Sequence, residues 1–200
     1  MRGRSHLASG VAAGIATVAA AEHLGVHLTI WQDAAVVATV AVGSLLPDLD
    51  SPRSIASRVV PLVSPAASWA VRLLSAAVYR ATRTRWDDQA EGTHRYLTHT
   101  AVFAGAVGVL AGIAAASTCG WWWLGVALAL GCLVHLWGDW ITVMGVPLLW
   151  PLKHRGKRWW RYRLPGTRIH SGHAFELRVM VPLFAVAGTG ASWLALAGVR

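Results

Sequence analysis

Residues 101–119 read AVFAGAVGVLAGIAAASTC, nineteen residues whose only ionisable side chain is one cysteine thiol. A helix of this length is long enough to cross the hydrocarbon core of a bilayer. Residues 179–199 form a second uncharged stretch, and 121–152 contains only His135 and Asp139 as imidazole or charged side chains. The sequence therefore predicts three membrane-spanning helices.

Two shorter apolar stretches, 7–21 and 34–46, precede these spans. Their length is more typical of a re-entrant or buried helix, so we interpret them as a membrane-inserted hairpin. Residues 51–96 mix apolar and arginine positions with a loosely helical period, which is typical of an interfacial helix. A helix packed on protein is the alternative that this pattern leaves open. We predict one domain, residues 1–200, that is all-α: a multi-pass transmembrane bundle of three spans plus the hairpin, with a cytoplasmic interfacial helix.

The basic residues are distributed unevenly. Seventeen of the 18 Lys and Arg side chains lie within 2–4, 53–95 and 153–178, which the five-segment arrangement puts on one side of the membrane. The positive-inside rule makes that side cytoplasmic, together with the N-terminus. Charged residues make up 14% of the chain, against about 25% in typical soluble domains, which argues against a soluble nucleic-acid-binding protein.

The remaining ionisable side chains concentrate where these segments begin or end. In the predicted topology those ends share the cytoplasmic face, so a bundle would bring the side chains together. His135 and Asp139 are four residues apart and share one face of a helix. The candidate metal ligands are His6, Asp48, Asp50, His94, His99, His135, Asp139 and Glu176.

Imidazole nitrogen and carboxylate oxygen suit a divalent metal, with Zn²⁺ as the first choice and Mn²⁺ or Mg²⁺ as alternatives. Asp48 and Asp50 are equally typical of a turn after Pro47, and His173 could be either a ligand or a helix cap. An ionisable pair inside an apolar segment is costly, so His135 and Asp139 indicate function more strongly.

Three segments in chain order resemble the YdjM-type inner-membrane metal-dependent hydrolases: GSLLPDLDSPRS (43–54), HRYLTHT (94–100), and HLWGDWIT running into GVPLLWP (135–151). That family is distantly similar to zinc-dependent phospholipase C and P1-type nucleases, which are all-helical enzymes with clustered zinc ions. Their His-x-x-x-Asp helix matches His135 and Asp139. Ser51 stands where family members often carry a histidine, and His173-x-x-Glu176 is one residue shorter than the later His-x-x-x-Glu helix of the phospholipase group.

We therefore expect an inner-membrane hydrolase that cleaves an ester or phosphoester bond of a lipid or lipid-linked substrate with metal-activated water. Asp50 or Glu176 is the expected general base, and Arg95 is expected to hold a phosphate or a developing oxyanion. Membrane lipids are the expected partners, and nucleic acid is not. The alternatives are a non-catalytic metal-binding or metal-transporting membrane protein, and a membrane-associated nuclease-like enzyme that uses the Arg and Trp residues of 153–168.

Overall fold

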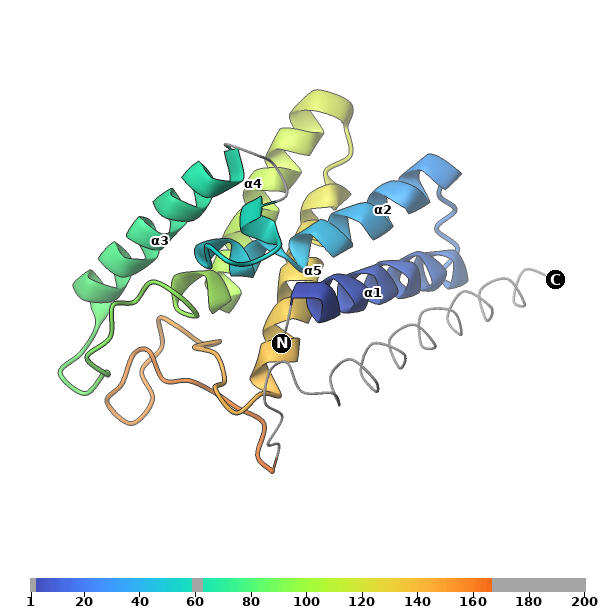
Figure 1. Cartoon of the computed structure of the whole chain (residues 1–200). Coiled ribbons are helices and arrows are strands. Elements are labelled where there is room, and N and C mark those ends of the chain that lie inside the picture. The colour runs from blue at the N-terminus through green and yellow to red at the C-terminus, as the bar shows by residue number, and fades with distance from the viewer. Residues whose placement is uncertain (1–2, 59–62, 167–200) are drawn as a thin grey trace.

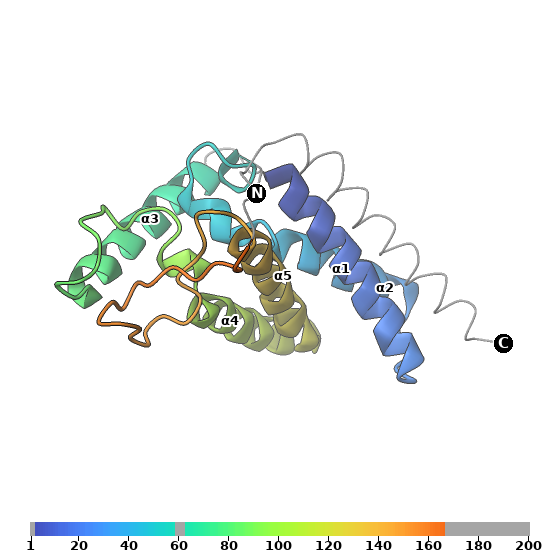
Figure 2. The ribbon, with the colours of Figure 1, turned by 90° about the horizontal axis from the view of Figure 1, so that it is seen from below.

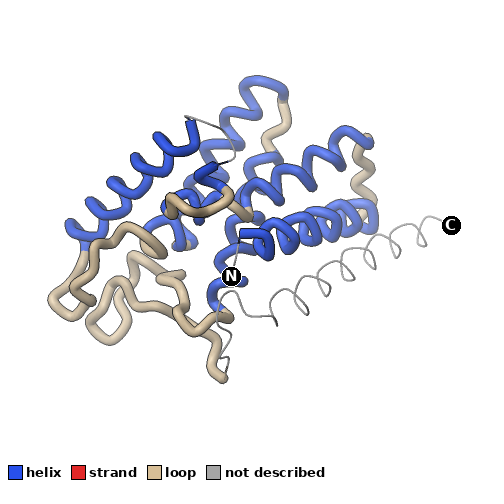
Figure 3. The backbone as a smooth tube through the Cα atoms, viewed as in Figure 1, coloured by secondary structure: helices blue, strands red, loops and turns tan. Residues whose placement is uncertain are grey.

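The computed structural model describes residues 3–58 and 63–166, which are helical with connecting loops and contain no β-strand (Figures 1 and 3). The all-α prediction is confirmed over these residues. The predicted span 179–199 and the candidate ligand Glu176 lie outside them. The elements in chain order are α1 (Gly3–His23), α2 (Ile30–Gly43), η1 (Leu46–Asp50), η2 (Ala56–Arg58), α3 (Val63–Thr82), η3 (Leu97–His99), α4 (Ala101–Cys119) and α5 (Trp123–Trp140).

Two helical hairpins, α1–α2 and α4–α5, form the centre of the molecule, and α5 packs across the first of them (Figures 1 and 2). Glycine makes this crossing close. A Cβ atom on Gly43 would collide with the Leu128 carbonyl oxygen, and one on Gly131 would lie 2.8 Å from the Cα of Gly43. The absence of these side chains lets the end of α2 lie directly against the middle of α5.

Three helical stretches in the described ranges are long and apolar enough to cross a membrane: Ile30–Asp50, Ala101–Cys119 and Trp123–Trp140. The predicted span 101–119 is confirmed as α4. The stretch Ile30–Asp50 shows that the second arm of the predicted hairpin, together with η1, has the length of a full span.

The predicted span 121–152 is wrong at its C-terminal end, because α5 stops at Trp140. Gly145 adopts a left-handed backbone with φ 62°, and Val146 then pairs with Tyr162 in an antiparallel bridge. Apolar residues 141–152 therefore belong to a folded loop, since the turn at Gly145 removes them from the helix axis.

The helix α4 begins at an N-cap that differs from the sequence interpretation, in which Thr98 could serve as the cap. Thr100 is the N-cap, and its hydroxyl accepts the backbone N–H of Phe103 at 3.1 Å. Thr98 lies one turn earlier, in η3, where its hydroxyl donates to Asp50. The cap residue and the residue that contacts the polar cluster are thus two different threonines.

The helix α3 and two long loops form a layer outside the hairpins. Tyr79 of α3 packs against Tyr96 and Trp159, and its hydroxyl donates to the Asp88 carbonyl oxygen. Asp87 accepts the backbone N–H of Trp159 at 2.9 Å and that of Thr84 at 2.6 Å. These contacts tie the 83–99 segment to the basic 153–163 loop. The expected helix within 51–96 is therefore confirmed as a helix, and it packs partly on protein.

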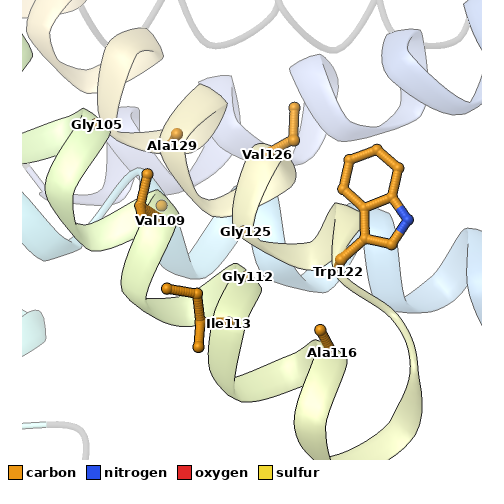
Figure 4. A pocket seen from close by; sticks show the side chains of 10 residues that line it. Gly105, Val109, Gly112, Ile113, Ala116, Trp122, Gly125, Val126 and Ala129 are labelled. Carbon is orange, nitrogen blue, oxygen red and sulfur yellow. The ribbon is translucent and has the colours of Figure 1, made fainter.

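The contact between α4 and α5 gives a stability prediction with a matched control. Figure 4 shows the apolar groove beside this contact, with Gly105 and Gly125 both on its lining. A Cβ on Gly125 would collide with the Gly108 carbonyl oxygen and lie 2.6 Å from the Cα of Gly112, whereas one on Gly105 meets nothing within 4 Å.

Gly125→Ala should therefore destabilise the protein by about 1–3 kcal/mol, because the backbone of α4 must move. Gly105→Ala should be neutral or stabilising by up to about 1 kcal/mol, since alanine favours the helix. Thermal unfolding of both variants in the same detergent measures the difference. Equal melting temperatures would contradict the close α4–α5 crossing.

Candidate metal centre

Polar side chains from four separate parts of the chain meet at one end of the two hairpins. The first turn of α1, the η1 segment after α2, the η3 segment before α4, and the last turn of α5 each contribute. Five of these side chains have no solvent exposure: His6, Asp50, His99, His135 and Asp139. The convergence expected from the sequence is thus present for every candidate ligand inside the described residues.

The α5 contribution begins with His135, whose ring is oriented by the backbone of the first hairpin. Its Nδ1 lies 2.8 Å from the carbonyl oxygen of Ser44, just after α2. A carbonyl oxygen only accepts, so Nδ1 carries the proton and Nε2 of the neutral ring keeps its lone pair. The lone pair of Nε2 therefore points into the cluster as a metal donor.

The ring of His99 is oriented by a two-step chain of hydrogen bonds. Thr98 donates its hydroxyl proton to Oδ2 of Asp50 at 2.6 Å, and Nδ1 of His99 lies 2.9 Å from the same hydroxyl oxygen. Because the hydroxyl has one proton and gives it to the carboxylate, Nδ1–H of His99 is the donor to Thr98. Its Nε2 is then also unprotonated and faces the cluster.

Four acceptor atoms consequently converge. Nε2 of His99 and Nε2 of His135 are 3.3 Å apart, and Asp139 Oδ2 lies 3.4 Å from the first and 3.7 Å from the second. Asp48 Oδ1 lies 3.9 Å and 3.7 Å from the same two nitrogens. Four donors about 2.0 Å from a tetrahedral zinc ion would be about 3.3 Å from one another. The spacing fits one divalent ion with a small contraction.

The side chain of His6 extends the cluster on the α1 side. Its ring stacks on His135 with centroids 3.6 Å apart, and its Nε2 lies 3.5 Å from Asp139 Oδ1. Neither ring nitrogen of this fully buried histidine forms a hydrogen bond among the described residues. A buried imidazole without hydrogen bonds is costly, which makes His6 a further donor available to a cation.

The carboxylate of Asp50 lies behind the histidines and holds them in place. Oδ1 accepts Nδ1–H of His94 at 2.6 Å, while Oδ2 accepts from Thr98 and from the backbone N–H of Arg95 at 3.2 Å. Burial alone would lower the pKa of His94, but the hydrogen bond to Asp50 and the nearby Asp48 raise that pKa above its ordinary value. With both oxygens engaged, Asp50 is better suited to positioning than to the expected role of general base.

Arg95 is held in an unusual backbone conformation beside the cluster. Its φ is 57°, a left-handed value that non-glycine residues rarely adopt. Its Nη2 donates to Asp139 Oδ1 at 3.0 Å, and its guanidinium is almost fully buried. The structure thus places Arg95 against a candidate ligand, where its charge balances the Asp139 carboxylate.

One edge of the cluster is open. The side chain of His94 is 43% exposed and that of Asp48 is 14% exposed, while the other ring nitrogens and carboxylates described above are enclosed. Asp48, Asp50 and His94 also place one ligand atom each within 4.8 Å of one another. A molecule outside the protein would reach the cluster from this edge. Glu176 and His173 lie outside the described residues, so their expected roles stay predictions.

The comparison with known families matches residues 1–199 to the family described as "YdjM inner membrane protein". The chain belongs to the YdjM family of inner membrane proteins. Two relatives named "Inner membrane protein YdjM", from Escherichia coli (strain K12) and Shigella flexneri, are each 30% identical to it over 154 residues. The match covers 74% of this chain and 63% of each relative's length, so the chain spans less than two thirds of these proteins. No solved structure matches the chain.

The structure adds residues to this YdjM-family site that the sequence interpretation missed. Thr98 orients His99, the carbonyl oxygen of Ser44 orients His135, and Thr142 lies 3.5 Å from the Arg95 guanidinium. The position of Thr98, directly before His99 and flanked by polar residues, was a usable signal. A backbone carbonyl carries no residue-type signal, so the contribution of Ser44 depends on the fold alone.

The two threonines beside His99 give a test of this second layer of contacts. Thr98→Val removes the acceptor for His99 Nδ1–H and a donor to Asp50, and should weaken zinc binding by about 10–100-fold. Thr100→Val removes the α4 N-cap and should cost about 1 kcal/mol of stability while zinc affinity is unchanged. Zinc titration against a competing chelator, with thermal unfolding of the same samples, checks both. Equal zinc affinity in the two variants would contradict the orienting role of Thr98.

Proposed function

We propose that this protein is a membrane-embedded, metal-dependent hydrolase that cleaves a phosphoester or ester bond of a lipid or lipid-linked substrate. The observation that carries the proposal is the convergence of four unprotonated acceptor atoms, from Asp48, His99, His135 and Asp139, at one end of candidate membrane spans. Neutral imidazole and carboxylate donors without thiolate favour zinc, and manganese or magnesium remain alternatives. The resemblance of the His135 and Asp139 helix to zinc-dependent phospholipases supports the reaction class.

The proposed ion would supply Lewis-acid polarisation of a phosphoryl or carbonyl oxygen and would activate water for attack. Asp48, His99, His135 and Asp139 would hold it, with His6 as an additional donor. Asp50 keeps His94 and, through Thr98, His99 in the required tautomers. These contacts fix the geometry before substrate arrives, so little reorganisation is needed.

The open edge is where the substrate would meet the chain's own proton-transfer group. His94 is half-exposed there, and its Nδ1–H is held by Asp50, which leaves Nε2 on the ring's other side for exchange with a bound molecule. A histidine supported by a carboxylate is a common general acid or base. We assign this role to His94 and keep Asp50 as its positioning partner. Glu176 remains the other candidate base.

Hydrolysis can be tested directly with purified protein in detergent. Zinc or manganese is added, and release of product from a chromogenic phosphodiester, from phospholipids and from single-stranded DNA is followed. His99→Ala should lose bound metal and lower turnover by at least about 100-fold, since it removes a central ligand. His27→Ala is the matched control, because His27 is exposed and pairs with Glu22 in the α1–α2 connection.

The outcomes separate the alternatives. Bound zinc without turnover of any of these substrates would favour the non-catalytic or transporting protein. Turnover of DNA in preference to phospholipid would favour the nuclease-like enzyme. An absence of bound metal in the wild-type protein would contradict the proposed centre itself.

The cytoplasmic orientation of the site is a further part of the proposal. Its support is the distribution of Lys and Arg, because the connections 24–29 and 120–122 contain none of them. A reporter that is active only in the cytoplasm should be active when fused before residue 1 and inactive when inserted at Gly120. A side chain at Gly120 would meet nothing within 4 Å, so this connection tolerates an insertion. The reverse pattern of reporter activity would place the metal centre on the periplasmic side.

A further inference from the structure

The polarity of α3 is reversed relative to a helix that packs on a soluble core. Its buried face carries Ser68 and Ser75 together with Tyr79. Its outer face carries three large apolar side chains, with exposed fractions of 65% for Trp69, 50% for Leu73 and 56% for Leu74. These outer positions recur at helical spacing and form one stripe, which we call the apolar stripe and define as Trp69, Leu73 and Leu74. In water such a stripe would be unfavourable.

The position of α3 leaves the stripe uncovered. In Figures 1 and 2, α3 lies at the edge of the molecule, beside η1 and η2 and away from the α1–α2 connection. The helix is not among the candidate membrane spans of the described residues. An exposed apolar stripe on a helix that does not span is typical of a helix lying in the membrane interface.

The charge around the stripe identifies the kind of surface that covers it. The 36 residues between Asp50 and Asp87 contain six arginines and no acidic residue: Arg53, Arg58, Arg72, Arg80, Arg83 and Arg85. Arg72 lies beside the stripe, and Arg80 is exposed near its C-terminal end. Anionic lipid headgroups attract such arginines. A second copy of the chain would bring the same positive charges into contact, which opposes dimerisation through this face.

We propose that α3 lies in the headgroup layer of an anionic bilayer, with the apolar stripe in the acyl boundary and the flanking arginines on lipid phosphates. The inner face of α3 then carries the loop of the metal centre. Ser75 donates to the Gly92 carbonyl oxygen at 2.7 Å and accepts the backbone N–H of Leu97 at 3.3 Å. His94 and Arg95 lie between those two anchor points. Lipid contact thereby supports the site loop, a step that rests on the proposed function.

Spin labels in proteoliposomes test the lipid contact independently of the metal. In a background with Cys119→Ser and Cys132→Ser, Leu73→Cys carries a label on the stripe, and Gln89→Cys carries the control label on an exposed loop. In vesicles of phosphatidylcholine with phosphatidylglycerol, oxygen should reach the label at 73 freely, and a water-soluble nickel chelate should reach it rarely. The label at 89 should show the opposite preference.

The arginines are tested with the double variant Arg72→Gln and Arg80→Gln. It should raise the access of the nickel chelate to the label at 73 in anionic vesicles and leave access in pure phosphatidylcholine unchanged. Free access of the chelate in the parent protein would overturn the proposal. Protection from both oxygen and chelate would overturn it in favour of a protein partner. Zinc content measured on the same samples keeps the two proposals apart, because lipid contact without zinc contradicts only the metal centre, and zinc without lipid contact contradicts only the placement of α3.

Discussion

The interaction on which the polar cluster depends is the mutual repulsion of acceptor atoms that carry no proton between them. Nε2 of His99 and Nε2 of His135 approach to 3.3 Å, with the Asp139 carboxylate close to both. Hydrogen bonds on the outer nitrogens hold each ring in the tautomer that creates this repulsion. A buried set of lone pairs is costly unless a cation occupies its centre. The positive charge of Arg95 answers part of that requirement, on the far oxygen of Asp139.

The helices can bring these atoms together only because the two hairpins approach closely. Gly43 and Gly131 meet where α2 crosses α5, one position before Ser44 and one turn before His135. The same close approach lets the Ser44 carbonyl oxygen reach the His135 ring. Backbone packing and ligand geometry are thus coupled, since a side chain at either glycine would separate the Ser44 carbonyl from the imidazole that it orients.

The layer outside the hairpins has a different physical basis. The helix α3 turns its serines and Tyr79 inward to bind the 83–99 segment, and aromatic contacts join that segment to the basic loop. Its apolar stripe faces outward, so bilayer and protein would share the work of stabilising the layer. In our proposals the open edge at Asp48 and His94 belongs to this layer, which is also where a lipid-linked substrate would arrive.

The sequence alone was sufficient for the helical class, the α4 span, the helix within 51–96 and the convergence of His6, Asp48, Asp50, His94, His99, His135 and Asp139, because apolar length, charge distribution and the cost of intramembrane ions act locally along the chain. It could not place the end of α5, where the turn at Gly145 and the pairing of Val146 with Tyr162 involve distant residues. It also could not separate ligands from their supports. Asp48 and Asp50 are equivalent by residue type, and only the tertiary structure puts Asp48 beside two Nε2 atoms and Asp50 behind the rings, since which oxygen meets which nitrogen depends on how η1 packs against η3 and α5.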